Sequence, residues 1–210
     1  MKKLLTTVFG LSVACATGLL HAEEPKGDAK AGAGKVAMCI GCHGISGYQA
    51  NFPEVYKVPK IGGQDAKYIT AALEAYKKGE RKFPSMRAIA DSLTEQDMAD
   101  IAAYFAGQKM SVGAADPKLI ERGEALFRGG KLAEGMPACT GCHSPNGAGL
   151  AAAGFPKLGG QHGQYVAKQL TDFREGNRTN DGDAMTMRAI AAKLSNKDIE
   201  AVSSYIQGLH

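Results

Sequence analysis

Two short stretches of this chain each combine two cysteines with a histidine at the same spacing, CIGCH at 39–43 and CTGCH at 139–143. Two thiols three positions apart lie on one side of a helical turn, where they can add across the two vinyl groups of a haem while the adjacent histidine reaches the iron. The pattern therefore predicts two covalently bound haem c groups. The residues assigned to them are Cys39, Cys42 and the iron ligand His43, and Cys139, Cys142 and the iron ligand His143.

Other chemistry for a cysteine pair fits this chain less well. A zinc ribbon needs two CxxC knuckles typically about fifteen to twenty residues apart, whereas these two lie in separate halves of the sequence. A thioredoxin-like dithiol needs a βαβ context, and no such pattern surrounds either motif. A chance match would explain one CxxCH but hardly two in register within a repeat, so haem attachment is the favoured interpretation.

The two halves of the chain repeat each other beyond the cysteine motifs. PKIGGQ at 59–64 matches PKLGGQ at 156–161, and MRAIADSL at 86–93 matches MRAIAAKL at 187–194. Three matching blocks in the same order indicate duplicated units of roughly ninety residues, each the size of a small domain. The repeat predicts an N-terminal domain over 23–108 and a C-terminal domain over 120–210. Residues 109–119, KMSVGAADPKL, contain Gly, Pro and small side chains and are predicted to be the linker.

The first 22 residues have the features of a cleaved secretory signal peptide. Lys2 and Lys3 precede a short apolar run, and Ala22 is the small residue at the expected cleavage site. A transmembrane anchor is disfavoured because the run is short and contains Thr, Ser and Gly, and the context of Cys15 fits a lipidation signal poorly. In an oxidising compartment the four remaining cysteines should not stay free, which agrees with their covalent use.

Helical patterns dominate both halves, and a shorter helix, over 28–38 or 119–130, is expected to lead toward each CxxCH motif. Residues 65–79 place apolar side chains on one face and end at Gly79, and their repeat ends at Gly176. A further helix in each unit begins at a capping residue, Thr94 or Ser195. No stretch alternates convincingly with period two, so the fold is predicted to be all-α. Each unit is small and rich in glycine, so an apolar group such as a haem should fill part of its core.

A haem iron held by one histidine has a sixth position, and the ligand there separates electron transfer from catalysis. The repeat pairs Met86 with Met187, and a thioether at the same place in both units is what two His/Met haems require. Met98 pairs with an isoleucine, so it is expected in the core. The remaining candidates, Met110, Met185 and His162, have no methionine or histidine at the matching position.

Two further pairs of residues are expected near the haems. The axial histidine needs a carbonyl to hold its other ring nitrogen, and Pro59 and Pro156 in the shared PK(I/L)GGQ block suit this role because proline keeps its carbonyl while fixing φ. A plain turn proline is the alternative interpretation. Arg87 and Arg188 follow the two paired methionines and are predicted to lie near haem propionates.

The ordered motifs CIGCH, PKIGGQ and PSMRAIA, followed by CTGCH, PKLGGQ and MTMRAIA, resemble the cytochromes c4. The resemblance implies two tandem class I cytochrome c domains related by a pseudo-twofold axis, with two haems bound covalently. It also implies a periplasmic location, peripheral membrane association in some members, and electron delivery from a cytochrome bc complex toward a terminal oxidase. The second unit departs from the first by extra residues before its CxxCH and before its methionine.

Composition and ligation narrow the function further. The chain has 25 basic and 21 acidic residues, and loss of Lys2 and Lys3 leaves 23 against 21, a net charge of +2. A nearly neutral protein lacks the concentrated basic surface that binding of nucleic acid favours. Two six-coordinate haems predict an electron carrier, not an enzyme, with redox proteins as partners and no small-molecule substrate. The alternatives are the haem subunit of a flavin-dependent enzyme such as a sulfide dehydrogenase, and a peroxidase-like open haem, which the paired methionines disfavour.

Overall fold

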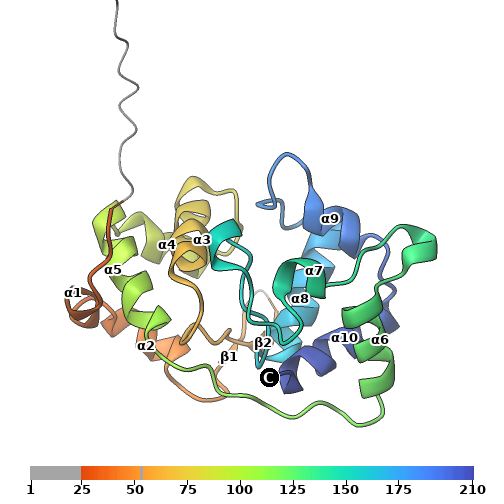
Figure 1. Ribbon diagram of the computed structural model, residues 1–210. Coiled ribbons are helices and arrows are strands. Elements are labelled where there is room, and N and C mark those ends of the chain that lie inside the picture. Colours follow the sequence, from red (N-terminus) through yellow and green to blue (C-terminus); the bar gives the residue numbers. More distant parts are fainter. Residues whose placement is uncertain (1–24, 53) are drawn as a thin grey trace, which may run out of the picture.

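The computed structural model describes residues 25–52 and 54–210. Two groups of helices lie side by side, and each corresponds to one sequence repeat (Figure 1). The predicted signal peptide, residues 1–22, lies outside the described residues. The fold is mostly helical, as the sequence predicted, with each repeat forming its own unit.

The described residues of the N-terminal unit form five helices and a short hairpin. Its elements are α1 (Ala29–Ala33), α2 (Ala37–His43), β1 (Gln49–Ala50), β2 (Tyr56–Lys57), α3 (Ala66–Lys78), α4 (Pro84–Asp91) and α5 (Glu95–Ala106). The C-terminal unit repeats this order without a named strand among its described residues. Its elements are α6 (Ile120–Gly129), η1 (Leu132–Glu134), α7 (Thr140–His143), η2 (Ala151–Ala153), α8 (Gly163–Glu175), α9 (Thr186–Ala191) and α10 (Asn196–Gly208).

The expected capping residues determine where the longer helices begin and end. Thr94 forms a capping box with Asp97 at the start of α5, and Ser195 forms the equivalent box with Asp198 at the start of α10. Gly79 ends α3 with φ 76°, a left-handed conformation that costs glycine little. Gly176 ends α8 in the same way with φ 74°.

The first and last helices of each unit cross at very close range. Helix α1 packs on α5, and α6 packs on α10. A Cβ atom added at Gly32 would lie 2.1 Å from the Asp100 carbonyl oxygen, and one added at Gly123 would lie 2.4 Å from the Ala201 carbonyl oxygen. Both crossings therefore depend on a residue without a side chain, and they hold the ends of each unit together.

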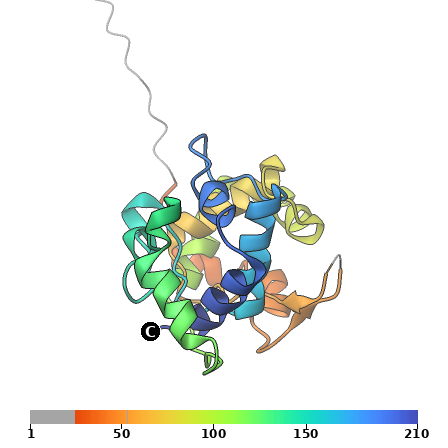
Figure 2. The same ribbon diagram turned by 90° about the vertical axis from the view of Figure 1, so that its right-hand side faces the viewer.

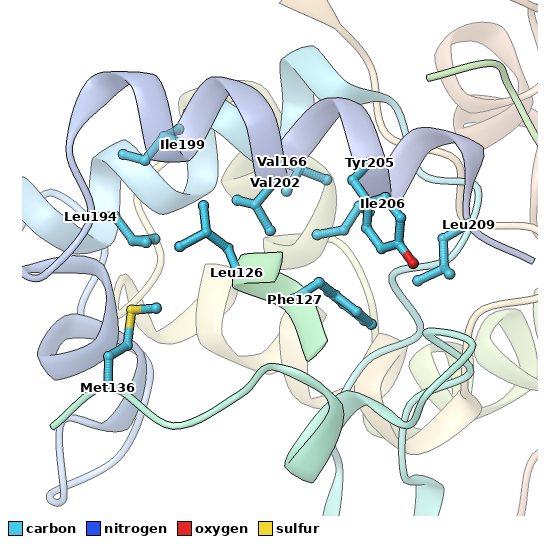
Figure 3. Packing of buried hydrophobic residues seen from close by; sticks show 10 residues of the cluster. All are labelled: Leu126, Phe127, Met136, Val166, Leu194, Ile199, Val202, Tyr205, Ile206 and Leu209. Carbon is cyan, nitrogen blue, oxygen red and sulfur yellow. The ribbon is translucent and has the colours of Figure 1, made fainter. Parts of the chain in front are cut away.

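Each unit buries an apolar cluster beside this crossing. In the C-terminal unit the cluster joins α6, α8 and α10, with Phe127 and Met136 among its least exposed side chains (Figure 3). In the N-terminal unit Met98, Ile101 and Phe105 of α5 are buried against α3, which confirms the core position predicted for Met98. Both clusters extend to a motif cysteine, since Cys39 packs against the N-terminal cluster and Cys139 against the C-terminal one.

The structure differs from the predicted elements in two places. The helix expected over 28–38 is interrupted, because α1 ends at Ala33 with Gly34 as its cap and α2 starts at Ala37. The antiparallel hairpin β1–β2, which projects from the surface in Figure 2, is absent from the all-helical expectation. Each strand has two residues, which is too short to produce a period-two pattern.

A segment without helix connects α5 to α6 along the lower edge of the molecule in Figure 1. It lies against α10, since the Gly113 amide donates to the Gln207 carbonyl at 3.0 Å and the Gln207 side chain donates to the Ala114 carbonyl at 2.7 Å. Within 25–52 and 54–210, no helix has the length and apolar character needed to cross a membrane.

Candidate functional site

A cavity of about 970 Å³ runs between the two units, and its wall is largely apolar. It brings together most of the residues that the sequence singled out. The predicted haem-binding residues that line it are Cys39, Cys42, His43, Pro59 and Met86 of the first unit, and Cys139, Cys142, His143, Pro156 and Met187 of the second. Residues from both CxxCH motifs therefore face one shared space.

Both motif histidines are held by the predicted proline carbonyls. The Nδ1 atom of His43, the last residue of α2, lies 2.8 Å from the Pro59 carbonyl oxygen. The Nδ1 atom of His143, the last residue of α7, lies 2.9 Å from the Pro156 carbonyl oxygen. A carbonyl can only accept, so each Nδ1 must carry the proton, which leaves the lone pair on Nε2 for a metal ion.

Burial also favours the ligand form of these groups. It lowers the pKa of His43 and of His143, although the hydrogen bond to the proline carbonyl acts in the opposite direction. A neutral imidazole is the form that binds metal. Burial raises the pKa of the Cys39 thiol and raises that of Cys139 to about 11. No disulfide joins the four motif cysteines in the described part of the chain.

The two paired methionines differ in position from the other candidates for the sixth ligand. Met86 lies on α4 and Met187 on α9, and both line the cavity. Four other candidates do not line it: Met98 in the core of the N-terminal unit, Met110 in the connecting segment, Met185 with 50% of its surface exposed, and His162 at the start of α8. The cavity lining thus includes the pair that the repeat selected, together with Met38 and Met136, which precede the two CxxCH motifs.

The two arginines predicted near propionates lie outside the cavity lining. Arg87 is exposed, with its Nε 3.8 Å from Asp91, and the Arg188 Nε lies 2.7 Å from the Asp181 carboxylate. A different pair, Arg81 and Arg178, lines the cavity and is buried. Sequence reasoning missed this pair, although each arginine follows the glycine that ends α3 or α8 by two positions.

Arg81 and Arg178 bind tyrosines of the opposite unit. Arg81 donates to the Tyr165 hydroxyl at 2.6 Å, and Arg178 donates to the Tyr68 hydroxyl at 3.3 Å. Burial alone would raise the pKa of Tyr68, but the charges of Arg178 and Arg81 outweigh it and lower the pKa to about 7. The cavity thus holds strong buried positive charge close to the boundary between the units.

Two glutamines form a second reciprocal pair of contacts between the units. The side chain of Gln64 accepts from the Lys157 amide at 2.8 Å and donates to the Lys157 carbonyl at 2.9 Å. The side chain of Gln161 accepts from the Lys60 amide at 2.9 Å and donates to the Lys60 carbonyl at 2.8 Å. Each contact mirrors the other, as a pseudo-twofold axis between the units requires.

These features together fit the haem groups that the motifs predict. The apolar wall suits a flat macrocycle, and the cavity offers each unit two thiols, a neutral imidazole and a thioether. The buried guanidinium groups of Arg81 and Arg178 would supply positive charge for the carboxylate side chains of haem. No group of three His, Cys, Asp or Glu side chains able to hold a bare metal ion occurs among the residues that the structure describes.

Comparison with known proteins assigns the chain to a family. A family model for cytochrome c matches residues 29–109 and 120–210. Cytochrome c4 from Pseudomonas aeruginosa is 60% identical over 210 residues, which cover 100% of both chains. The chain belongs to the cytochrome c4 family. A crystal structure of reduced recombinant cytochrome c4 from Pseudomonas stutzeri matches with a TM-score of 0.80 and 61% identity, and the match covers 88% of this chain and 100% of that one.

Membership of the cytochrome c4 family confirms the predicted fold class of two tandem cytochrome c domains and the predicted cofactors, two covalently bound haem c groups. The protein is therefore a dihaem electron-transfer cytochrome. A more distant relative, the "Thiosulfate dehydrogenase electron acceptor" of Stutzerimonas stutzeri, is 34% identical over 182 residues, covering 83% of this chain and 80% of the relative.

Proposed function

We propose that this cytochrome c4 is a periplasmic electron carrier that accepts electrons from a quinol-oxidising cytochrome bc complex and passes them toward a terminal oxidase, without acting as an enzyme itself. Residues 1–22 would direct export, 23–108 and 120–210 would each carry one haem, and 109–119 would link them. The proposal is supported by the 60% identity to a cytochrome c4 and by the two CxxCH motifs that face one cavity.

Within each domain we assign one residue set to each haem. Cys39 and Cys42 form the thioethers of the first haem, with His43 and Met86 as its iron ligands. The equivalent set in the second domain is Cys139, Cys142, His143 and Met187. The observation that carries this assignment is the presence of both methionines in the same cavity as both histidines. The predicted propionate contacts of Arg87 and Arg188 stay a prediction.

When bound, each haem supplies an iron that alternates between the ferrous and ferric states. The protein side chains determine how readily this happens. Pro59 and Pro156 hold the histidine rings in the tautomer that presents Nε2, and the apolar wall of the cavity excludes water. The thioether of Met86 or Met187, bound to the iron, would close it to substrates and raise its potential relative to a second imidazole.

The absorption spectrum of the ferric protein tests the ligand assignment. The weak long-wavelength band between methionine sulfur and ferric iron should be present for two haems. Met86→Ala and Met187→Ala should each remove about half of its intensity, because each removes one of two equivalent ligands. Met185→Ala is the matched control, since Met185 is 50% exposed and lies outside the cavity lining. Full intensity in either ligand variant would contradict the assignment.

The similarity to a thiosulfate dehydrogenase electron acceptor favours a second candidate, in which this protein receives electrons from one dedicated oxidising enzyme. The predicted alternative of a haem subunit in a flavin-dependent complex belongs to the same class. Incubating the purified oxidised protein with quinol-oxidising membranes separates the candidates. Rapid reduction of a stable free protein supports the carrier between membrane complexes. Reduction only by a substrate-oxidising enzyme, or isolation as a stoichiometric complex with one, supports the second candidate.

A further inference from the structure

We propose that Gln64 and Gln161 are positioning residues that couple the domains in a crossed manner, so that each glutamine tunes the iron-binding histidine of the opposite domain. The inference rests on the proposed ligand roles of His43 and His143. Gln64 and Gln161 end the two PK(I/L)GGQ blocks, and their presence in both blocks is not explained by a role as haem ligand or propionate contact.

A single peptide group links each glutamine to the motif histidine of the opposite domain. The Pro156 carbonyl, which accepts from His143 Nδ1 at 2.9 Å, and the Lys157 amide, which donates to Gln64 Oε1 at 2.8 Å, belong to the same peptide unit. The chain of contacts therefore runs from Gln64 of the N-terminal domain through one peptide to the histidine of the C-terminal domain.

The mirror-image chain has the same geometry. The Pro59 carbonyl accepts from His43 Nδ1 at 2.8 Å, and the Lys60 amide of the same peptide unit donates to Gln161 Oε1 at 2.9 Å. Two independent copies of one arrangement, with every donor–acceptor distance between 2.8 and 2.9 Å, indicate a shared requirement. A contact that only joined the surfaces would not need to fall on this peptide in both domains.

The physical effect follows from polarisation along a hydrogen-bond chain. When a peptide N–H donates to an oxygen, electron density moves toward its own carbonyl, which becomes a better acceptor. A better acceptor at Nδ1 makes the imidazole a stronger electron donor to the iron and fixes the ring orientation. A more strongly donating histidine stabilises ferric over ferrous iron and so lowers the potential of that haem.

The surroundings of the glutamines keep them in place. Gln64 is 5% exposed and Gln161 is 4% exposed. Each side-chain oxygen also accepts from the amide of the next residue, Asp65 or His162, at 3.0 Å. Buried hydrogen bonds in a region of low dielectric are strong, and the second amide contact prevents the carboxamide from rotating away. The coupling is therefore a fixed property of the domain interface.

The preceding glycines bring the glutamines to this position. Gly63 has φ 75° and an added Cβ would lie 2.7 Å from the Met110 amide nitrogen. Gly160 has φ 83° and an added Cβ would lie 2.9 Å from the Ser111 carbonyl oxygen. The block turns tightly against the segment between the domains, and the glutamine side chain then points across the interface.

The test compares Gln64→Met with Gln161→Met in the full-length dihaem protein. Methionine has similar length and fills the same space, but it gives the peptide amide no strong acceptor. A haem-resolved redox titration followed by NMR should show that Gln64→Met raises the potential of the His143 haem more than that of the His43 haem. Gln161→Met should show the reverse. In the reduced protein the Nδ1 proton of the opposite histidine should move toward lower chemical shift, since its hydrogen bond is weaker.

Two further variants serve as controls. Lys67→Met removes another contact between the domains, from Lys67 Nζ to the Ala152 carbonyl at 3.2 Å, without touching either proline peptide. It should leave both Nδ1 protons unchanged. Gln64→Glu keeps an oxygen that can accept from the Lys157 amide, so the His143 Nδ1 proton should stay at its original shift or move opposite to the Gln64→Met shift. If Gln64→Met fails to fold, Gln161→Met still tests the coupling through the mirror-image contact with Lys60.

The possible results separate this inference from the ligand assignment. In Gln64→Met and Gln161→Met, equal potential shifts at both haems, potential shifts confined to the haem of the substituted domain, or unchanged Nδ1 protons would overturn the crossed coupling while His/Met ligation stands. If His43→Ala and His143→Ala both retained normal low-spin spectra, the ligand assignment itself would fail. The coupling would be established if Gln64→Met and Gln161→Met each raised mainly the potential of the haem in the opposite domain and Lys67→Met left both Nδ1 protons unchanged.

Discussion

The guanidinium group of Arg81 donates a 2.6 Å hydrogen bond to the hydroxyl of Tyr165, so a buried cation of the N-terminal domain is satisfied by a side chain of the C-terminal domain. The symmetry-related contact from Arg178 to Tyr68 is longer, at 3.3 Å. Gln169 accepts from both arginines, at 3.0 and 2.7 Å, and ties the two contacts together. The two halves of the interface thus pair the same residue types, an arginine with a tyrosine, but the two hydrogen bonds differ in length.

This inequality predicts different costs for removing the two hydroxyl groups. Tyr165→Phe leaves a buried charged donor without its short hydrogen bond, and the free energy of unfolding should fall by about 1.5–3 kcal/mol. Tyr68→Phe removes the longer contact and should cost less. Urea unfolding monitored by haem absorbance and by circular dichroism measures both effects. Equal losses, or a larger loss for Tyr68→Phe, would show that the two contacts do not differ in strength as their distances indicate.

The crossing of α6 and α10 gives a second prediction. An added methyl group at Gly123 would lie 2.4 Å from the Ala201 carbonyl oxygen and 2.6 Å from Tyr205 Cβ, so the two helices would have to move apart. Overpacking of this kind typically costs about 1–3 kcal/mol, and Gly123→Ala should lower the thermal midpoint accordingly. Gly129→Ala is the matched control on the same helix, because nothing lies within 4 Å of its added Cβ. Alanine favours helix, so the control should be neutral or slightly stabilising.

Local patterns in the sequence were sufficient to predict where the individual helices begin and end, but not to predict the contacts between the domains. The caps at Thr94 and Ser195 and the stops at Gly79 and Gly176 occur where the sequence predicted them, because each depends on neighbouring residues alone. The proline carbonyls could be expected because a histidine ring needs an acceptor close by. The hairpin was missed because two residues per strand carry no periodic signal.

The contacts between the domains depend on how two folded units dock, and no local sequence pattern predicts that docking. Arg81 and Gln64 bind side chains and backbone that lie far away in sequence, at Tyr165 and Lys157. The only available signal was repetition, since Gln64 and Gln161 end the same block in both halves. Such repetition shows that a residue is required in both domains, but it does not show that its partner lies in the opposite one.

The last helix of each domain carries a buried carboxylate that should make stability depend on pH. At Asp198, burial acts to raise the pKa, but the Ser195 amide and hydroxyl, Lys131 and Arg122 outweigh it and hold the pKa well below its usual range. At Asp100, the hydrogen bond from Lys35 is the main cause that lowers the pKa to about 2. Both carboxylates connect the last helix of a domain to residues near its first helix.

The sign of the effect follows from proton uptake. Above a pH of about 4 these aspartates are ionised in both the folded and unfolded states, so their stabilising contribution is fully present. As the pH falls below about 4, the unfolded chain takes up protons before the folded one, and the free energy of unfolding decreases. For Asp100 this loss extends down to its folded pKa of about 2. The urea midpoint should therefore be nearly level above pH 5 and fall steeply between about pH 4 and pH 2.

Substitution identifies which carboxylates cause this acid sensitivity. Asp198→Asn should lower stability at pH 7, because Lys131 and Arg122 lose their charged partner, and it should flatten the decline between about pH 4 and pH 2. Asp100→Asn should do the same for the N-terminal domain, where Lys35 loses one of its two carboxylates. Asp183→Asn is the control, since Asp183 is exposed and has no ion-pair partner among the described residues. An unchanged acid decline in both Asp198→Asn and Asp100→Asn would place the titrating groups elsewhere in the protein.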